Sequence, residues 1–240
     1  MKNKALKVSV VLPAYREKEN LVALVPRIAQ ALADSDLEIL VMDDNSQDGT
    51  EEAMNLLRRD QKIPVRTIVR KTNRGFALSI RDGLDQATGD ALVIMDSDGN
   101  HDPAYLPMMV TNLNFYGCVS ATRFQYGGSM DSQSRFVLSW LFNLFIRLVT
   151  RKYVTDSLYG LIAIRKEELQ KINFDKVFWG YGDYCIRLLY YLQCMKVTIL
   201  QFPAKNGVRL HGEGNSKFFK VFIQYFTAVM KLVITERIYV

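Results

Sequence analysis

The sequence predicts an α/β protein in which a mostly parallel central sheet is flanked by helices. The 240 residues are 49% hydrophobic and 23% charged, which is the composition of a folded globular protein. In the first half, short apolar runs alternate with segments of helical character, as in a parallel sheet covered on both faces. The residues that follow the apolar runs are strongly polar, as expected where the ends of strands form a ligand site.

The first half alternates strand and helix from its beginning. An apolar run over residues 8–12 predicts a strand, and the helix expected over 17–32 has apolar residues at helical spacing. Asp48 and Glu51 stand three residues apart and predict a capping box at the start of the next helix. The expected order is strand 8–12, helix 17–32, strand 37–42, the helix after Asp48, strand 65–69, helix 75–87 and strand 91–95.

The second half is less regular. It predicts a helix over 132–150, a mixed stretch to residue 164, a helix over 183–192, a strand over 197–202, a basic loop and a last helix over 217–235. There are no repeats, low-complexity tracts or evident linkers. The expected organisation is therefore one domain over residues 1–240.

Charge and composition narrow the classes of function. The net charge of +6 and the pI near 9.1 favour an anionic partner, such as nucleic acid, a phosphorylated small molecule or a membrane surface. Three cysteines without a CxxC pair indicate neither a disulfide framework nor a cysteine-ligated zinc site. The first apolar run is too short for a signal peptide, and no run of 18 apolar residues predicts a spanning helix. We therefore expect a cytoplasmic protein.

The strongest chemical motif is Asp96-Ser97-Asp98, at the end of an apolar strand. Two carboxylates at a turn can converge on a hard divalent cation such as Mg²⁺ or Mn²⁺, with Asn100 as a further oxygen ligand. An EF-hand loop is excluded, because its sixth and twelfth positions would be His101 and Pro107. The alternative, in which the aspartates only cap the helix near residue 103, is less favoured, because Asp102 alone could do so.

The Asp43-Asp44-Asn45-Ser46 segment allows two interpretations. Such residues commonly build turns and helix caps. Beside the other acidic loop on the same sheet edge, they could also supply oxygen acceptors for a nucleobase or ribose.

Four motifs occur in order over roughly the first hundred residues. They are Val10-Val11-Leu12-Pro13-Ala14-Tyr15-Arg16-Glu17, Val41-Met42-Asp43-Asp44-Asn45-Ser46-Gln47-Asp48-Gly49-Thr50, Asn73-Arg74-Gly75 and Asp96-Ser97-Asp98. In these motifs the chain resembles family 2 of the inverting glycosyltransferases, with the GT-A nucleotide-diphospho-sugar transferase fold. The resemblance implies a nucleotide-sugar-binding half over 1–103 and an acceptor-binding half with amphipathic helices over 104–240.

The resemblance implies a role for each matching residue. The donor would be a GDP- or UDP-linked sugar, with Mg²⁺ or Mn²⁺ on its diphosphate. Pro13, Tyr15 and Glu17 would border the nucleoside, and Asp44 would contact base or ribose. The residues implied around the metal and diphosphate are Asp96, Ser97, Asp98 and Asn100. A cation there would stabilise the charge of the departing diphosphate as a Lewis acid.

Within the family the chain looks most like the polyprenyl-phosphate sugar synthases of the dolichol-phosphate mannose synthase type. The residues implied to hold donor diphosphate and acceptor phosphate are Arg123, Arg135, Arg209, Ser216 and Lys217, and Arg209 would act in catalysis. The chain departs from that branch after Asp156, where Tyr159-Gly160-Leu161-Ile162 replaces the usual Ser-Gly-Phe-Arg, and the basic loop is longer.

Asp183 favours a second interpretation. Gly180-Tyr181-Gly182-Asp183 looks like the motif in which relatives that glycosylate a hydroxyl use an aspartate as general base. A helix cap is an equally good explanation of Asp183, and a phosphate acceptor needs no base. A remote alternative from another class is a basic protein that binds nucleic acid. It is disfavoured because acidic residues gather at the strand ends.

Two predicted helices have wide apolar faces next to basic residues. In the helix over 217–235, polar side chains recur every three or four positions, and the helix over 132–150 has a similar narrow polar stripe. Such helices can lie on anionic lipid or can cover the sheet as core helices. The expectation is a peripheral protein at the cytoplasmic face of the membrane, with a polyprenyl phosphate or another lipid-linked acceptor as partner.

Overall fold

A single seven-stranded sheet runs through the protein in the computed structural model, which describes residues 6–207, 211 and 218–237. The strand order is β3-β2-β1-β4-β6-β5-β7. The strands are β1 (Val8–Ala14), β2 (Leu37–Asp43), β3 (Val65–Val69), β4 (Ala91–Ile94), β5 (Cys118–Thr122), β6 (Ile162–Arg165) and β7 (Ile199–Pro203).

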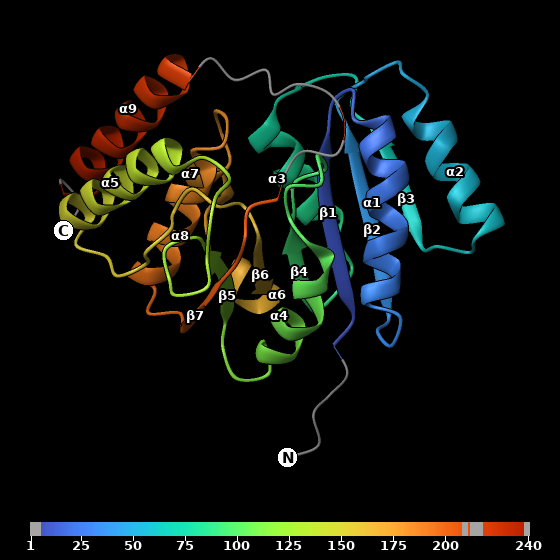
Figure 1. The fold of residues 1–240 in the computed structure, drawn as a ribbon, viewed down its shortest axis with the longest axis horizontal. Coiled ribbons are helices and arrows are strands. Elements are labelled where there is room, and N and C mark those ends of the chain that lie inside the picture. Colours follow the sequence, from blue (N-terminus) through green and yellow to red (C-terminus); the bar gives the residue numbers. More distant parts are fainter. Residues whose placement is uncertain (1–5, 208–210, 212–217, 238–240) are drawn as a thin grey trace.

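Helices cover both faces of this sheet (Figure 1). The helices are α1 (Lys18–Ala31), α2 (Thr50–Asp60), α3 (Phe76–Gln86), α4 (Leu106–Asn112), α5 (Gln133–Thr150), α6 (Lys166–Leu169), α7 (Phe174–Val177), α8 (Tyr184–Cys194), α9 (Phe218–Arg237) and the 3₁₀ turn η1 (Pro103–Tyr105). Each helix and strand expected from the sequence is present, with small shifts at its ends.

The sheet is mostly parallel, as predicted. β1 pairs in parallel with β2 and β4, and β2 pairs in parallel with β3. The exception is β6, which lies antiparallel between β4 and β5. The sequence analysis left this strand in a mixed stretch, because a four-residue apolar run carries too little periodicity to be recognised as a strand.

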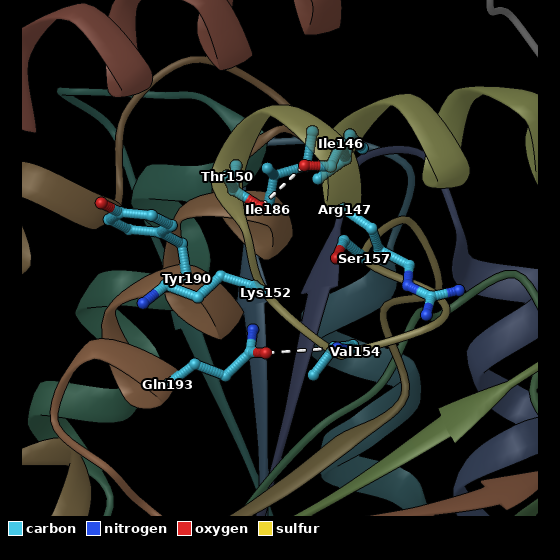
Figure 2. Close-up of a pocket in the computed structure, with 9 residues that line it drawn as sticks. All are labelled: Ile146, Arg147, Thr150, Lys152, Val154, Ser157, Ile186, Tyr190 and Gln193. Carbon is cyan, nitrogen blue, oxygen red and sulfur yellow. Dashed lines mark hydrogen bonds between the residues drawn. The ribbon is translucent and has the colours of Figure 1, made fainter. Parts of the chain in front are cut away.

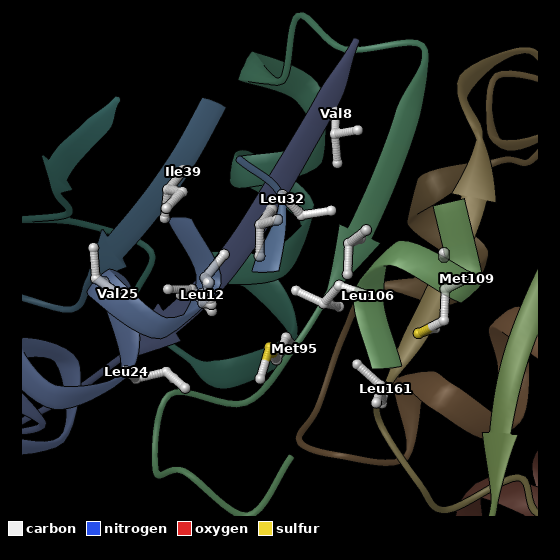
Figure 3. Close-up of a cluster of buried hydrophobic side chains, with 14 of the residues drawn as sticks. Val8, Leu12, Leu24, Val25, Leu32, Ile39, Met95, Leu106, Met109 and Leu161 are labelled. Atoms are coloured by element: carbon white, nitrogen blue, oxygen red, sulfur yellow. The ribbon is translucent and has the colours of Figure 1, made fainter. Parts of the chain in front are cut away.

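The two faces of the sheet bury two separate apolar clusters, because successive residues of a strand point to opposite sides. On one face, Val10 and Leu12 of β1 pack with residues of α1, α2 and α4. Figure 3 shows this cluster around Leu12, Leu24 and Ile39. On the other face, Val11 packs with residues of α3 and α8.

The start of α2 differs from the prediction, because the capping box of Asp48 and Glu51 does not form. Gly49 is the N-cap residue, with a left-handed φ of 85°. Glycine adopts this conformation without steric cost. Asp48 lies one residue earlier, and its carboxylate accepts hydrogen bonds from the amide and hydroxyl of Thr50.

Replacing Gly83 of α3 by Ala is expected to destabilise the fold. A methyl group there would lie 2.4 Å from Val11 Cγ1 and 2.9 Å from Met42 Cγ, since α3 packs closely on β1 and β2. Overpacking of this kind costs about 1–3 kcal/mol, which outweighs the better helix propensity of alanine. Urea denaturation should show the lower midpoint, with Asp85→Ala on the exposed side of α3 as the control. An unchanged midpoint for Gly83→Ala would contradict the expected close packing.

Candidate active site

Three polar loops meet at the carboxyl edge of the parallel strands, where α/β sheets bind ligands. The loop after β4 carries Asp96, Ser97 and Asp98. The Ser97 hydroxyl donates a hydrogen bond to the carbonyl of Pro13, 2.7 Å away, in β1. The Asp96 amide donates to Nδ1 of His101 at 3.2 Å. These hydrogen bonds hold residues 96–98, which we call the aspartate turn, against the neighbouring strand β1 and the buried His101 ring.

Asp98 is oriented by Asn100. The Asn100 amide nitrogen donates to Asp98 Oδ1 at 3.1 Å, and its side-chain Nδ2 donates to Oδ2 at 2.7 Å. Gly99, with a φ of 85°, allows the chain to turn back between them. Asn100, predicted as a metal ligand, therefore contacts Asp98 in this structure.

The Asp96 carboxylate is poorly solvated, although part of its side chain is accessible from outside the protein. About a third of its side chain is accessible, at 32%. Burial, with a smaller contribution from the charge of Glu17, raises the pKa of Asp96 to about 6. A carboxylate that is costly to ionise because of burial gains from a nearby cation.

The carboxylate oxygens at this turn are the type of ligand that Mg²⁺ and Mn²⁺ prefer. Within residues 6–207, 211 and 218–237, no three His, Cys, Asp or Glu side chains gather into a metal-holding group. Mg²⁺ is usually held by one or two carboxylates together with waters and substrate phosphates. Asp96 and Asp98 fit such a site, in which the substrate completes the coordination.

Asp44 is already engaged by groups of the protein. Its Oδ1 forms an ion pair with Arg70, and its Oδ2 accepts a hydrogen bond from the amide of Gly75 at 2.7 Å. Arg70 is buried and also binds Asp82 and the carbonyl of Asn73. Asp44 therefore holds the Asn73-Arg74-Gly75 turn at the sheet edge, beside the position predicted for the nucleoside.

The loop after β1 exposes an aromatic ring between two cations. Tyr15 is 48% exposed, and the guanidinium groups of Arg16 and Arg74 lie 5.3 and 5.2 Å from its ring centroid. Glu17, at the N-terminus of α1, accepts a hydrogen bond from Asn20. The loop therefore brings an accessible ring and positive charge to the same edge as Asp96.

Arg123 is buried in an ion pair with Asp156. Its Nε and Nη2 donate to the two carboxylate oxygens at 2.7 and 2.8 Å. Its guanidinium also lies 5.2 Å from the ring centroid of Tyr159. Arg123 was predicted to hold phosphate groups, and in this structure its charge is matched by Asp156.

Asp183 is fully buried at the start of α8. Its Oδ2 pairs with Arg187, while its Oδ1 accepts hydrogen bonds from the amide of Tyr181 at 2.8 Å and from Gln224 of α9 at 3.3 Å. Arg187 further donates to the carbonyls of Val177 and Trp179. These contacts join α8, α9 and the loop before α8.

The basic loop predicted to hold phosphates lies mostly outside the described residues, including Arg209, Ser216 and Lys217. The chain just before it reaches the aspartate turn, because the Gly207 amide donates to the Asn100 carbonyl at 2.8 Å. Arg135 is exposed in the first turn of α5.

A small pocket lies apart from these loops, between the C-terminal half of α5 and α8 (Figure 2). Its volume of about 10 Å³ is room for one water molecule. Among its lining residues, Gln193 accepts hydrogen bonds from the amides of Tyr153 and Val154. This pocket is too small for a nucleotide or a sugar.

The sequence analysis missed two residues that organise the site, Arg70 and Arg187. Arg70 had a usable signal, because it directly follows β3 at the same sheet edge as Asp44. Arg187 had none, because its position in α8 does not reveal that the surrounding chain buries it.

Comparison with known proteins agrees with this geometry. A family model described as "Glycosyl transferase family 2" matches residues 9–172. A dolichol-phosphate mannosyltransferase of Saccharomyces cerevisiae is 30% identical over 95% of this chain and 87% of that protein. One from Pyrococcus furiosus is 28% identical over 95% of this chain, which spans only 64% of that relative. An undecaprenyl-phosphate mannosyltransferase of Micrococcus luteus is 32% identical over 74% of each chain.

Solved structures share the fold at low sequence identity. Glucosyl-3-phosphoglycerate synthase from Mycobacterium tuberculosis, in complex with Mn²⁺, uridine diphosphate and phosphoglyceric acid, matches with a TM-score of 0.71 and 20% identity, over 95% of this chain and 78% of that chain. The same enzyme with Mg²⁺ and uridine diphosphate matches with a TM-score of 0.70 and 20% identity, over 95% and 79%. These matches confirm the predicted GT-A fold.

Proposed function

Because the chain belongs to glycosyltransferase family 2, we propose that it transfers a sugar from a nucleoside diphosphate to a polyprenyl phosphate with inversion at the anomeric carbon. The observation that carries the proposal is the aspartate turn, fastened by Ser97 to β1 at the ligand-binding edge of the sheet. The relatives named as dolichol- and undecaprenyl-phosphate mannosyltransferases support mannose as the sugar and a polyprenyl phosphate as the acceptor.

The donor side of the reaction is assigned to the three loops at the sheet edge. Tyr15 offers an exposed ring to the base, and Arg74 beside it adds positive charge. Asp96 and Asp98 would hold Mg²⁺ or Mn²⁺, with Asn100 orienting Asp98. Such a cation supplies positive charge that stabilises the departing diphosphate.

The transfer itself needs little from the protein besides position and charge. An oxygen of the acceptor phosphate forms a bond to the anomeric carbon while the bond from that carbon to the diphosphate breaks. The diphosphate leaves with the bonding electrons, and no proton has to move, because the acceptor is already an anion. The side chains of this site therefore act by holding donor and acceptor in line.

Asp183 distinguishes this reaction from transfer to a sugar hydroxyl. A general base must reach the proton that it removes. Asp183 is 0% exposed, and both of its oxygens bind groups of the protein. The geometry favours a phosphate acceptor, for which Asp183 has a positioning role.

The reaction can be tested by a screen of donors. Purified protein would be incubated with GDP-mannose, UDP-glucose and related donors, Mn²⁺ or Mg²⁺, and a short polyprenyl phosphate, and the release of nucleoside diphosphate would be measured. Release that requires both the lipid phosphate and the metal supports the proposal. If no donor gave release of nucleoside diphosphate, the result would contradict the proposal.

A membrane-facing surface is formed by α5 and α9, which lie side by side at the edge of the molecule (Figure 1). Stacked or tilted ring pairs join them, Phe142 with Phe222 and Phe145 with Phe226. The two helices also expose large apolar side chains, namely Val137, Leu138, Trp140, Leu141, Leu148, Phe222, Ile223, Phe226 and Ile234. No helix in the described ranges is long and apolar enough to cross a bilayer. We propose that this surface lies on the membrane that carries the acceptor.

Replacing Leu141 and Ile223 together by Glu is expected to weaken binding to vesicles of anionic lipid about tenfold or more, because the buried apolar area is lost and like charges repel. Cosedimentation with the vesicles would measure the change. Leu56→Glu on α2 is the matched control, since Leu56 is 48% exposed and Leu141 is 49% exposed. Equal binding of the control and the double variant would exclude this surface.

A further inference from the structure

Tyr184, the first residue of α8, buries a hydroxyl that has no hydrogen-bond partner. In the part of the chain that the structure describes, only two buried side-chain oxygens are unpaired in this way, Thr67 Oγ1 and Tyr184 Oη. Tyr184 is 1% exposed, and its ring packs against Phe76 and Phe178. A buried polar group without a partner is costly, so folded proteins keep few of them.

The unpaired hydroxyl faces the aspartate turn across a glycine. A methyl group placed on Gly160 would lie 3.4 Å from Tyr184 Oη, 3.5 Å from Asp96 Oδ1 and 3.8 Å from His101 Cε1. The missing side chain of Gly160 thus leaves a small space that the hydroxyl and the carboxylate share. Apart from the chain neighbours of Gly160, these are the three atoms nearest to that position among the residues described.

His101 approaches the other oxygen of the same carboxylate. Its Nδ1 accepts a hydrogen bond from the Asp96 amide, so the neutral ring carries its proton on Nε2. Nε2 lies 3.8 Å from Asp96 Oδ2, which is too long for a hydrogen bond. Asp96 therefore has two potential donors nearby, the Tyr184 hydroxyl and His101 Nε2, and accepts a hydrogen bond from neither.

The hydroxyl is suited to donate. Burial raises the pKa of Tyr184 well above its usual value, and the nearby Asp96 carboxylate adds to the effect. The phenol therefore keeps its proton, and a carboxylate oxygen is the natural acceptor for it. Carboxylates that bind a metal are commonly held by such outer partners, which orient the ligating oxygen.

We propose that Tyr184 is a positioning residue for Asp96, whose hydroxyl donates a hydrogen bond to the Asp96 carboxylate when that carboxylate holds the divalent cation of the donor diphosphate. This inference rests on the proposed function. It assigns a purpose to the unpaired hydroxyl and to the absence of a side chain at Gly160.

Two variants test the inference from opposite sides. Tyr184→Phe removes the hydroxyl and keeps the ring. Gly160→Ala keeps the hydroxyl and places a methyl group between it and Asp96, at distances that are ordinary contacts and require no shift of the chain. Each is expected to weaken Mn²⁺ binding about 10- to 100-fold, as the loss of outer partners does. The double variant should be no weaker than either single variant, because both remove the same interaction.

The measurements are the Kd of Mn²⁺ by titration calorimetry, with and without GDP or UDP, and the melting temperature of the metal-free protein. Tyr184→Phe should leave that melting temperature unchanged or raise it, because an unpaired hydroxyl is removed. Tyr126→Phe, on a fully exposed ring, is the control and should change neither quantity.

Each outcome has one meaning. Unchanged Mn²⁺ affinity in both variants, with normal binding in the wild type, overturns the inference and leaves the proposed function standing. A loss for Tyr184→Phe only with a complete nucleotide sugar, and not with Mn²⁺ and GDP or UDP, overturns it in favour of direct contact with the sugar. A lower melting temperature with unchanged affinity makes Tyr184 structural. Wild-type protein that binds no Mn²⁺ even with nucleotide contradicts the proposed function instead.

Discussion

Asp98→Asn is expected to lower turnover about a thousandfold, which is the scale of removing a charge that stabilises a departing anion. Asparagine has the same shape as aspartate and can still accept a hydrogen bond from the Asn100 amide. The fold should therefore survive while the charge that we propose to bind the cation is lost. Asp96→Asn should have a similar effect, because its carboxylate lies in the same turn.

The measurement is the initial rate of nucleoside diphosphate release at saturating donor, together with Mn²⁺ affinity. Asp102→Asn is the matched control. Asp102 is four residues from Asp98, caps η1 by accepting a hydrogen bond from the Ala104 amide, and forms an exposed ion pair with Arg27. It should keep near wild-type turnover. If Asp98→Asn retained a tenth of the wild-type rate, the assignment of this turn to the cation would fail.

The second large effect is on stability, and it concerns Asp183. Asp183→Asn is expected to lower the free energy of unfolding by about 3–5 kcal/mol, because it leaves Arg187 buried without its counter-charge. Both side chains are almost completely buried, with 1% and 2% exposed. Urea denaturation would measure the loss, with Glu167→Gln in the exposed pair with Arg165 as a control that should not shift the midpoint.

The same variant tests the choice of acceptor. At a temperature where Asp183→Asn is fully folded, turnover with polyprenyl phosphate should stay within a few-fold of wild type, because a phosphate acceptor needs no base. The double variant Asp183→Asn/Arg187→Met should recover part of the stability, since it removes the unmatched charge. A hundredfold loss of turnover in the folded variant would instead favour Asp183 as a base.

The sheet, and the edge of it at which the candidate site lies, were predictable because their signals are local. Strands β2 and β4 contain the continuous apolar runs 39–42 and 91–94, and parallel topology places the polar residues that follow these runs at one edge of the sheet. The order of motifs then indicated the family. These features depend on residues close together in the sequence.

The partners of the charged residues were not predictable, because they are set by contacts between distant segments. Asp44 meets Arg70, 26 positions later, and Arg123 meets Asp156, 33 positions later. Asp44 and Arg123 were both expected to face substrate. In the structure, each forms an ion pair with an oppositely charged side chain of the protein. The unpaired hydroxyl of Tyr184 is hidden from the sequence for the same reason.

The antiparallel strand β6 has a consequence for how the chain is made. It occupies the place between β4 and β5, although the chain forms β5 about forty residues earlier. Until Ile162–Arg165 leaves the ribosome, β4 has an unpaired edge of backbone donors and acceptors, which can recruit strands from other nascent chains. The interval between the synthesis of β4 and that of β6 is thus the one in which this unpaired edge exposes the nascent chain to aggregation.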